Sequence, residues 1–170
     1  MQTQSKILLF LFIAFNLAAF AFAKLTYAAS TDSVTATVTV QNISVSVTDG
    51  AIAYGTLAIN TSAGTNAADT QTATNDGNVT ENLNIKGQNS ANWTLDSTNA
   101  TEDHYIHRFC TSSCTSPPTS YTALTTNYQT LATSVSSSGN QTFDLYITTP
   151  QSSTVYTQQS VDIMVQAVAS

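Results

Sequence analysis

Hydroxyl and apolar residues alternate strictly over residues 33–40, which read Ser-Val-Thr-Ala-Thr-Val-Thr-Val. A period of two places every apolar side chain on one face of a strand and every hydroxyl on the other. β-Branched threonine also favours the extended conformation. The same chemistry continues through residues 30–170, of which about one third are serine or threonine. The chain is therefore expected to fold as an all-β protein whose strands bury one face.

The N-terminal region carries the pattern of a secretion signal. Lys6 supplies a positive charge ahead of residues 7–23, which contain a single polar residue. This stretch is long for the core of a signal peptide and slightly short of the about 20 residues that span a membrane. Small residues up to Ala23 and up to Ala28 are typical of signal-peptidase sites. We predict that residues 1–28 are a cleaved signal, with cleavage after Ala23 or an uncleaved membrane anchor as alternatives.

The remaining residues, 29–170, suffice for one domain with a buried core. Ten aspartate and glutamate residues stand against only two basic ones in this region, Lys86 and Arg108. Nucleic-acid binding needs clustered lysine and arginine, so this class of partner is excluded. We expect a secreted or cell-surface domain that binds no nucleic acid and, once the signal is removed, no membrane.

The first alternating segment changes face part-way along its length. Its large apolar residues are Val34, Val38 and Val40 on one parity, followed by Ile43, Val45 and Val47 on the other. A shift of one residue turns every side chain to the opposite face of a sheet. The sequence therefore predicts either a β-bulge at positions 41 and 42 or a strand that crosses there between two sheets.

Further strands are expected along the rest of the chain. A strand is predicted over residues 52–59, and the Asp-Gly pair within residues 75–78 predicts a hairpin between its two neighbouring strands. Later strand-like stretches are residues 93–95, 104–110, 121–131, 143–147 and 161–167. The eight or nine strands and the absence of a helical period predict an antiparallel two-sheet sandwich of immunoglobulin-like type. Trp93, the only tryptophan, is expected to anchor its core.

Two cysteines, Cys110 and Cys114, lie close together in the sequence. In an exported chain such a pair most often forms a local disulfide, and the small ring should add little global stability. With His104 and His107 the same residues make a set of four zinc ligands. Positions 104 and 107 of one strand point to opposite faces, which opposes a shared metal. A disulfide is therefore the favoured prediction.

The sequence contains no pattern typical of catalysis. No Gly-x-Ser-x-Gly motif accompanies the histidines, and residues 75–78 resemble only a fragment of a calcium loop. The acidic residues that would have to gather around a calcium ion are Asp69, Glu81, Asp96, Glu102 and Asp103. The sequence does not show that they meet. We predict a protein that is not an enzyme and has no cofactor.

Several segments resemble known exported proteins. Residues 52–57, followed by residues 72–78 and 143–147, are similar to strands of exported immunoglobulin-like surface proteins of bacteria. The pattern also resembles the secreted TasA/camelysin group, whose β-sandwich subunits form extracellular fibres by donating an N-terminal strand. The triplet Trp-Thr-Leu at residues 93–95 is similar to that of wall-binding WxL domains, which carry two such triplets where this chain has one. These resemblances imply a surface protein.

Residues 33–48 are long for one strand of a compact domain, and they follow directly on the predicted signal. Few charges protect the edge strands against pairing between molecules. The leading hypothesis is a non-enzymatic structural protein of the cell surface, a fibre or sheath subunit that pairs this segment with a neighbouring subunit. The candidate residues for strand donation are Val34, Val38, Val40, Ile43, Val45 and Val47. Pairing of the segment within its own monomeric domain remains the equal alternative.

A second hypothesis is a secreted adhesin or a module that binds carbohydrate or cell wall. The aromatic residues available for stacking on sugars are Tyr105, Tyr121, Tyr128 and Tyr146. This hypothesis requires several of them to share one exposed face, because tyrosines of sandwich proteins usually pack in or beside the core. The expected partners are accordingly either further copies of the chain or components of the cell surface.

Overall fold

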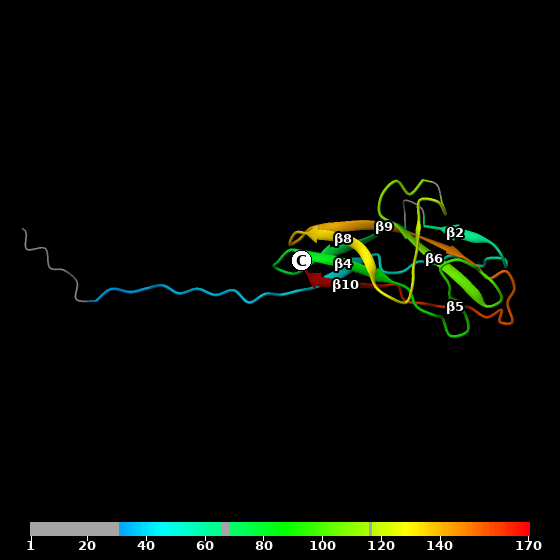
Figure 1. Cartoon of the computed structure of the whole chain (residues 1–170), viewed down its shortest axis with the longest axis horizontal. Coiled ribbons are helices and arrows are strands. Elements are labelled where there is room, and N and C mark those ends of the chain that lie inside the picture. Colours follow the sequence, from blue (N-terminus) through cyan, green and yellow to red (C-terminus); the bar gives the residue numbers. More distant parts are fainter. Residues whose placement is uncertain (1–30, 66–68, 116) are drawn as a thin grey trace, which may run out of the picture. The chain divides into compact units, whose positions relative to one another are not determined.

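The structure is a computed structural model that describes residues 31–65, 69–115 and 117–170 (Figure 1). The predicted signal, residues 1–28, lies outside the described residues. The chain divides into two compact units, Met1–Val38 and Thr39–Ser170. In the first unit, residues 31–38 are exposed and belong to no helix or strand. The described part of the chain contains no helix long and apolar enough to cross a membrane.

The second unit is all-β, and its described residues contain no helix. Its strands are β1 (Val45–Thr48), β2 (Ser62–Gly64), β3 (Gln71–Asn75), β4 (Glu81–Lys86), β5 (Thr94–Leu95), β6 (His104–Cys110), β7 (Thr122–Ala123), β8 (Gln129–Val135), β9 (Asn140–Thr148) and β10 (Met164–Ala169). The all-β prediction is confirmed. The described strands number ten, rather than eight or nine, because short pairings such as β2 and β7 leave no alternation long enough to recognise.

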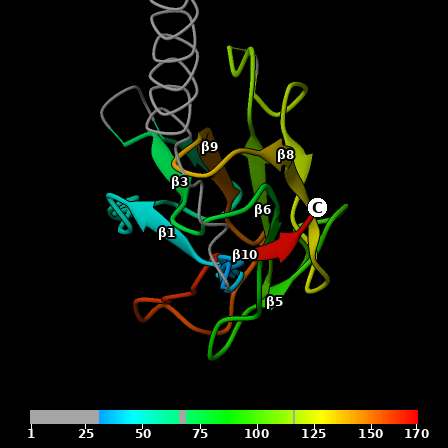
Figure 2. The ribbon, with the colours of Figure 1, turned by 90° about the vertical axis from the view of Figure 1, so that its left-hand side faces the viewer.

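The strands form two sheets. A seven-stranded sheet has the order β1-β3-β9-β6-β5, with β2 paired to β9 and β7 paired to β6, and a three-stranded sheet has the order β10-β4-β8. The edge strands β1 and β10 of the two sheets lie next to each other (Figure 2). The expectation of purely antiparallel pairing is wrong at β5, which runs parallel to β6 with Thr94 opposite His104. The connection between them brings the chain back to begin β6 beside the start of β5.

Side chains from both sheets meet in one hydrophobic core. The seven-stranded sheet contributes Ala73, Phe109, Phe143 and Leu145, and the three-stranded sheet contributes Leu83, Ile85, Leu131 and Val135. Buried and half-buried residues alternate at every position of β3 and β4. This alternation is the period-two pattern that the sequence predicts for strands with one buried face.

The two predictions for the first third of the chain need correction. The long strand predicted over residues 33–48 begins only at Val45, so the described residues 31–44 contain neither a bulged strand nor one that crosses between sheets. Residues 52–59 belong to no strand. Gly55 within this stretch and Asn60 directly after it adopt positive φ angles, which interrupts an extended run.

The predicted hairpin at residues 75–78 is also wrong, because β3 and β4 belong to different sheets. The side chain of Asn75 explains the change of sheet. Its amide nitrogen donates to the carbonyls of Val79 and Val135, and its Oδ1 accepts from the backbone of Gly77. A buried asparagine thus satisfies the backbone groups where the chain leaves one sheet for the other.

Candidate functional site

The first three strand-donation candidates stand in solvent. Val34 is 97% exposed, Val38 is 91% exposed and Val40 is 81% exposed. Isolated exposed valines are ordinary on protein surfaces, but here they recur at even-numbered positions of an alternating sequence. Residues 31–40 therefore expose three valines and belong to no strand.

The other three candidates lie on or beside β1. Val45 is half-buried and pairs with Asn75, while Val47 pairs with Ala73. Ile43 is partly exposed and precedes the strand. The set predicted from the sequence is thus divided, since Val45 and Val47 pair within the domain and the other four candidates lie in no strand.

The turn at residues 75–78 holds the chain where these two halves join. The Asn78 side chain accepts from the backbone of Asn42 and donates to the carbonyl of Val40, and Oε1 of the buried Glu81 accepts from the backbone of Ser44. Gly77 permits this close approach, because a Cβ there would lie 2.5 Å from the Asn42 carbonyl oxygen. The exposed segment is therefore anchored at its C-terminal end.

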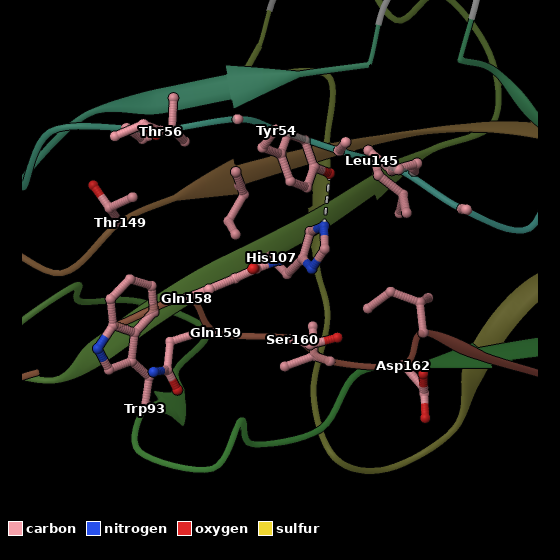
Figure 3. A pocket seen from close by; sticks show the side chains of 18 of the residues that line it. Tyr54, Thr56, Trp93, His107, Leu145, Thr149, Gln158, Gln159, Ser160 and Asp162 are labelled. Carbon is pink, nitrogen blue, oxygen red and sulfur yellow. Dashed lines mark hydrogen bonds between the residues drawn. The ribbon is translucent and has the colours of Figure 1, made fainter. Parts of the chain in front are cut away.

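An open groove of about 770 Å³ is lined by the segment that follows β1 and by the segment that precedes β10 (Figure 3). One wall is formed by residues 50–59 and the other by residues 155–163. Phe143, Leu145 and Ile147 of β9 line its floor together with His107 of β6. Two residues of the hydrophobic core, Phe143 and Leu145, are therefore part of the groove lining.

Both walls have strand-like side chains without strand pairing. Ile52 and Tyr54 are half-buried between exposed neighbours, and Val161 and Ile163 alternate in the same way. Within the described parts of the chain, no hydrogen bond reaches the peptide groups of residues 51–57 or 158–162. Unpaired backbone groups of this kind are available to another strand.

A tyrosine–histidine contact closes one side of the groove floor. The Tyr54 hydroxyl lies 2.9 Å from Nε2 of His107, and the two rings meet edge to face. Burial lowers the pKa of His107 to about 4, and burial likewise raises the pKa of Tyr54. His107 is therefore neutral at physiological pH, and its buried Nδ1 has no hydrogen-bond partner among the described residues. From the sequence, His107 was expected only as a potential zinc ligand.

The four tyrosines considered for sugar stacking do not share a face. Tyr105 is buried, and its hydroxyl donates to the carbonyl of Gln88, whereas the ring of Tyr128 lies under the ammonium group of Lys86. Only Tyr121 and Tyr146 lie together, with ring centroids 5.6 Å apart. The stacking surface predicted from four tyrosines thus contains one pair.

Trp93 is half-buried beside the groove and lies outside the central hydrophobic cluster. Its indole nitrogen donates to the hydroxyl of Ser153, and its ring lies against Tyr105. The prediction of a core anchor is therefore wrong, because the indole N–H meets its partner at the margin of the fold.

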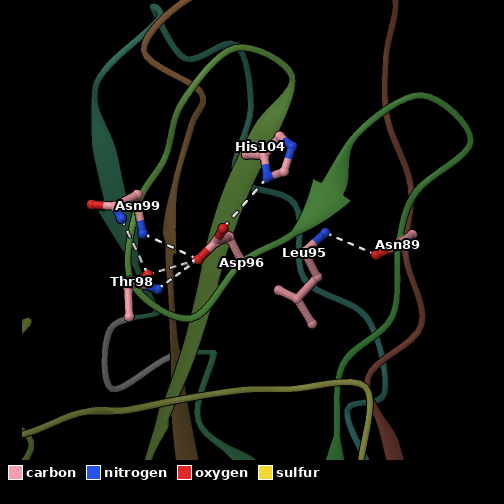
Figure 4. A network of polar contacts seen from close by, with 6 residues as sticks. All are labelled: Asn89, Leu95, Asp96, Thr98, Asn99 and His104. Atoms are coloured by element: carbon pink, nitrogen blue, oxygen red, sulfur yellow. Dashed lines mark hydrogen bonds and ion pairs between the residues drawn. The ribbon is translucent and has the colours of Figure 1, made fainter.

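The cysteine sulfurs lie at disulfide distance, with 2.14 Å between Cys110 and Cys114. The histidines of the alternative zinc set have separate surroundings. His104 lies 3.4 Å from a carboxylate oxygen of Asp96 (Figure 4), whereas His107 faces Tyr54. Across the described ranges, no group of three His, Cys, Asp or Glu side chains is placed to hold a metal ion.

Two of the acidic side chains considered for calcium, Asp96 and Asp103, accept hydrogen bonds from loop residues. Asp96 accepts from the backbone of Thr98 and Asn99, and these hydrogen bonds lower its pKa to about 2 (Figure 4). Asp103 accepts from the hydroxyl of Ser153, which lowers its pKa. Both carboxylates thus stabilise loops.

Comparison of the sequence with protein-family models gives no match, and neither curated proteins nor solved structures contain a significant relative. The exposed segment and the groove are therefore the features from which a function can be inferred.

Proposed function

We propose that this chain is a non-enzymatic structural protein of the cell surface, exported by residues 1–28 and assembled into fibres or sheaths through its N-terminal segment. In this proposal residues 29–170 form an immunoglobulin-like β-sandwich. The observation that carries the proposal is the exposure of Val34, Val38 and Val40 at even-numbered positions of a segment that forms no strand.

Pairing with a second molecule would bury the exposed valine side chains and would give the backbone of the segment hydrogen-bond partners in a strand. Fully burying a valine side chain contributes roughly 1.5–3 kcal/mol, and the added strand would satisfy its own backbone groups. The threonines between the valines suit a face that remains in water. A segment with this alternation is therefore chemically equipped to become a strand of another subunit.

Electron microscopy and light scattering across a concentration series test the proposal. Wild-type protein should form regular fibres or stable oligomers. The double variant Val34→Asp/Val38→Asp should remain monomeric, because it places charges on the apolar face. Thr35→Asp/Thr37→Asp is the matched control, since it adds the same charge to the opposite face and should still assemble. A wild-type protein that stays monomeric at high concentration would refute the assembly function.

The pair Tyr121 and Tyr146 favours a second function, binding of carbohydrate or cell-wall polymer. The rings are tilted by 47° against each other, and both are half-exposed. Aromatic rings with an exposed face stack on sugar rings through apolar contact. A glycan array with wild type and Tyr146→Ala tests this function, with Tyr156→Ala as the control for a solitary exposed tyrosine. Equal retention of all three proteins on the array, or retention of none, would exclude the tyrosine pair as a carbohydrate-binding site.

A further inference from the structure

We infer that the groove between residues 50–59 and residues 155–163 is the acceptor site for residues 31–40 of a second copy of this chain. The inference rests on the proposed assembly function and specifies its partner surface. It places the donated strand between two walls, above the floor formed by β9 and His107.

The backbone of the walls is suited to this occupant. Among the residues the structure describes, the peptide groups of 51–57 and 158–162 make no hydrogen bonds, although the flanking strands β1 and β10 are paired. Both flanking strands lie at the edges of their sheets. A donated strand would therefore add to an existing edge, which is the geometry of β-augmentation.

The side chains are complementary as well. The groove presents apolar side chains from both walls, including Ile52, Leu57, Val161 and Ile163. The donor presents valine or alanine at every second position from 34 to 40 and hydroxyls between them. With its valines toward Phe143 and Leu145, the donor would leave its threonines at the surface. The alternating residues 33–40 carry no charge, and the one charged donor residue, Asp32, precedes them.

The lengths also agree. At about 3.3 Å per residue, an extended segment of residues 31–40 spans roughly 33 Å. On the same scale, residues 51–54, which precede the positive φ of Gly55, span roughly 13 Å and residues 158–162 roughly 17 Å. The donor is therefore long enough to pair with the whole of either wall and to connect to its own domain.

The point at which residues 31–40 are attached to their own domain favours the groove of a second copy over the groove of the same molecule. The floor follows β9 from Phe143 toward Pro150, whereas Asn140, at the other end of β9, pairs with Thr74 beside the anchoring turn. The donor is thus attached to its domain at Val40, near the end of β9 opposite to the one toward which the groove extends. Such a head-to-tail contact repeats into an open filament.

Crosslinking between single-cysteine variants tests the inference. Thr37→Cys marks the donor, and Ala53→Cys and Ser160→Cys mark exposed positions in the two walls. Thr133→Cys on β8, at the opposite edge of the three-stranded sheet, is the control. A short bismaleimide joins free thiols and leaves the native disulfide intact. Mixtures of the donor variant with either wall variant should yield a crosslinked heterodimer, and the mixture with Thr133→Cys should not.

The outcomes separate the acceptor site from the assembly function. Crosslinks that disappear when Val34→Asp/Val38→Asp is added to the donor chain would support the groove as acceptor. Assemblies that crosslink only through Thr133→Cys, or through no wall position, would refute the groove as the acceptor site. The assembly function itself would still stand. A Thr37→Cys/Ala53→Cys double variant that crosslinks within one molecule at high dilution would overturn the second copy as occupant. Absence of both assemblies and crosslinks would refute the assembly function itself.

Discussion

Tyr54 and His107 join a wall of the groove to its floor, because the Tyr54 hydroxyl contacts Nε2 of His107 at 2.9 Å. Tyr54 belongs to an unpaired segment, whereas His107 lies in the middle of β6. This polar contact therefore fixes an otherwise unpaired stretch of backbone against the sheet. The shape of the groove depends on it.

Replacing Tyr54 by phenylalanine should destabilise the domain by about 1–3 kcal/mol, since Nε2 of a buried histidine would lose its partner. Urea-induced unfolding at pH 7 measures the effect. Tyr156→Phe is the control, because Tyr156 is 82% exposed and should leave stability unchanged. Equal stabilities of wild type and Tyr54→Phe would show that the hydrogen bond does not hold the wall.

Stability should fall as the pH decreases from about 6.5 to about 4. His107 has a pKa of about 4 in the folded protein, whereas an unfolded histidine titrates near 6.5. In this window the unfolded chain binds the extra proton, so protons favour unfolding and the loss reaches the order of 3 kcal/mol. Unfolding free energies measured between pH 7 and pH 4 test this. His107→Gln should show a flatter pH profile, and an unchanged profile would contradict the assignment to His107.

Gly77→Ala should destabilise the protein by about 1–3 kcal/mol or more, because the added Cβ collides with Oε1 of Glu81 and crowds the Asn42 carbonyl. Gly55→Ala provides the comparison, since its Cβ would meet nothing within 4 Å and only its φ of 71° is unfavourable. Thermal unfolding should therefore rank Gly77→Ala as the more damaging substitution. The opposite ranking would show that the 75–78 turn tolerates expansion.

Replacing both Cys110 and Cys114 by alanine should cost at most about 2 kcal/mol, since a disulfide that closes so short a loop restricts the unfolded chain little. Reduction of the wild type should give a similar shift in Tm. The variant should also assemble like the wild type, because neither cysteine lines the groove. A loss of assembly would mean that the loop contributes to the contact between subunits.

The alternation of apolar side chains was sufficient to predict a strand where that strand has pairing partners in its sheet. The alternation of Phe143, Leu145 and Ile147 corresponds to β9, which is paired along its length, and the alternation around Leu83 and Ile85 corresponds to β4. The same alternation failed at residues 33–40 and 52–59, which belong to no strand. Periodicity reports which side chains can face an interior, and it carries no information about whether a partner strand is available.

The sequence alone could not locate the groove. Its two walls are about 100 residues apart in the chain, and only the long-range order of the sheets brings them together. The Asp-Gly pair at positions 76 and 77 is typical of a hairpin, but the buried Asn75 side chain redirects the chain into the other sheet. One signal in the sequence pointed to the second wall. The alternation of Val161, Ile163 and Val165 begins before Met164, where the pairing of β10 with β4 starts.

Hydrogen–deuterium exchange of peptides covering residues 31–40 shows whether this segment becomes a strand on assembly. The protein is compared as dilute monomer and as concentrated assembly. In the monomer the amides of this segment should exchange at the rate of an unstructured chain, because they are exposed. In the assembly we predict strong protection of residues 31–40 together with residues 51–57 and 158–162. If residues 31–40 exchange equally fast in monomer and assembly, the segment is not donated as a strand to another subunit.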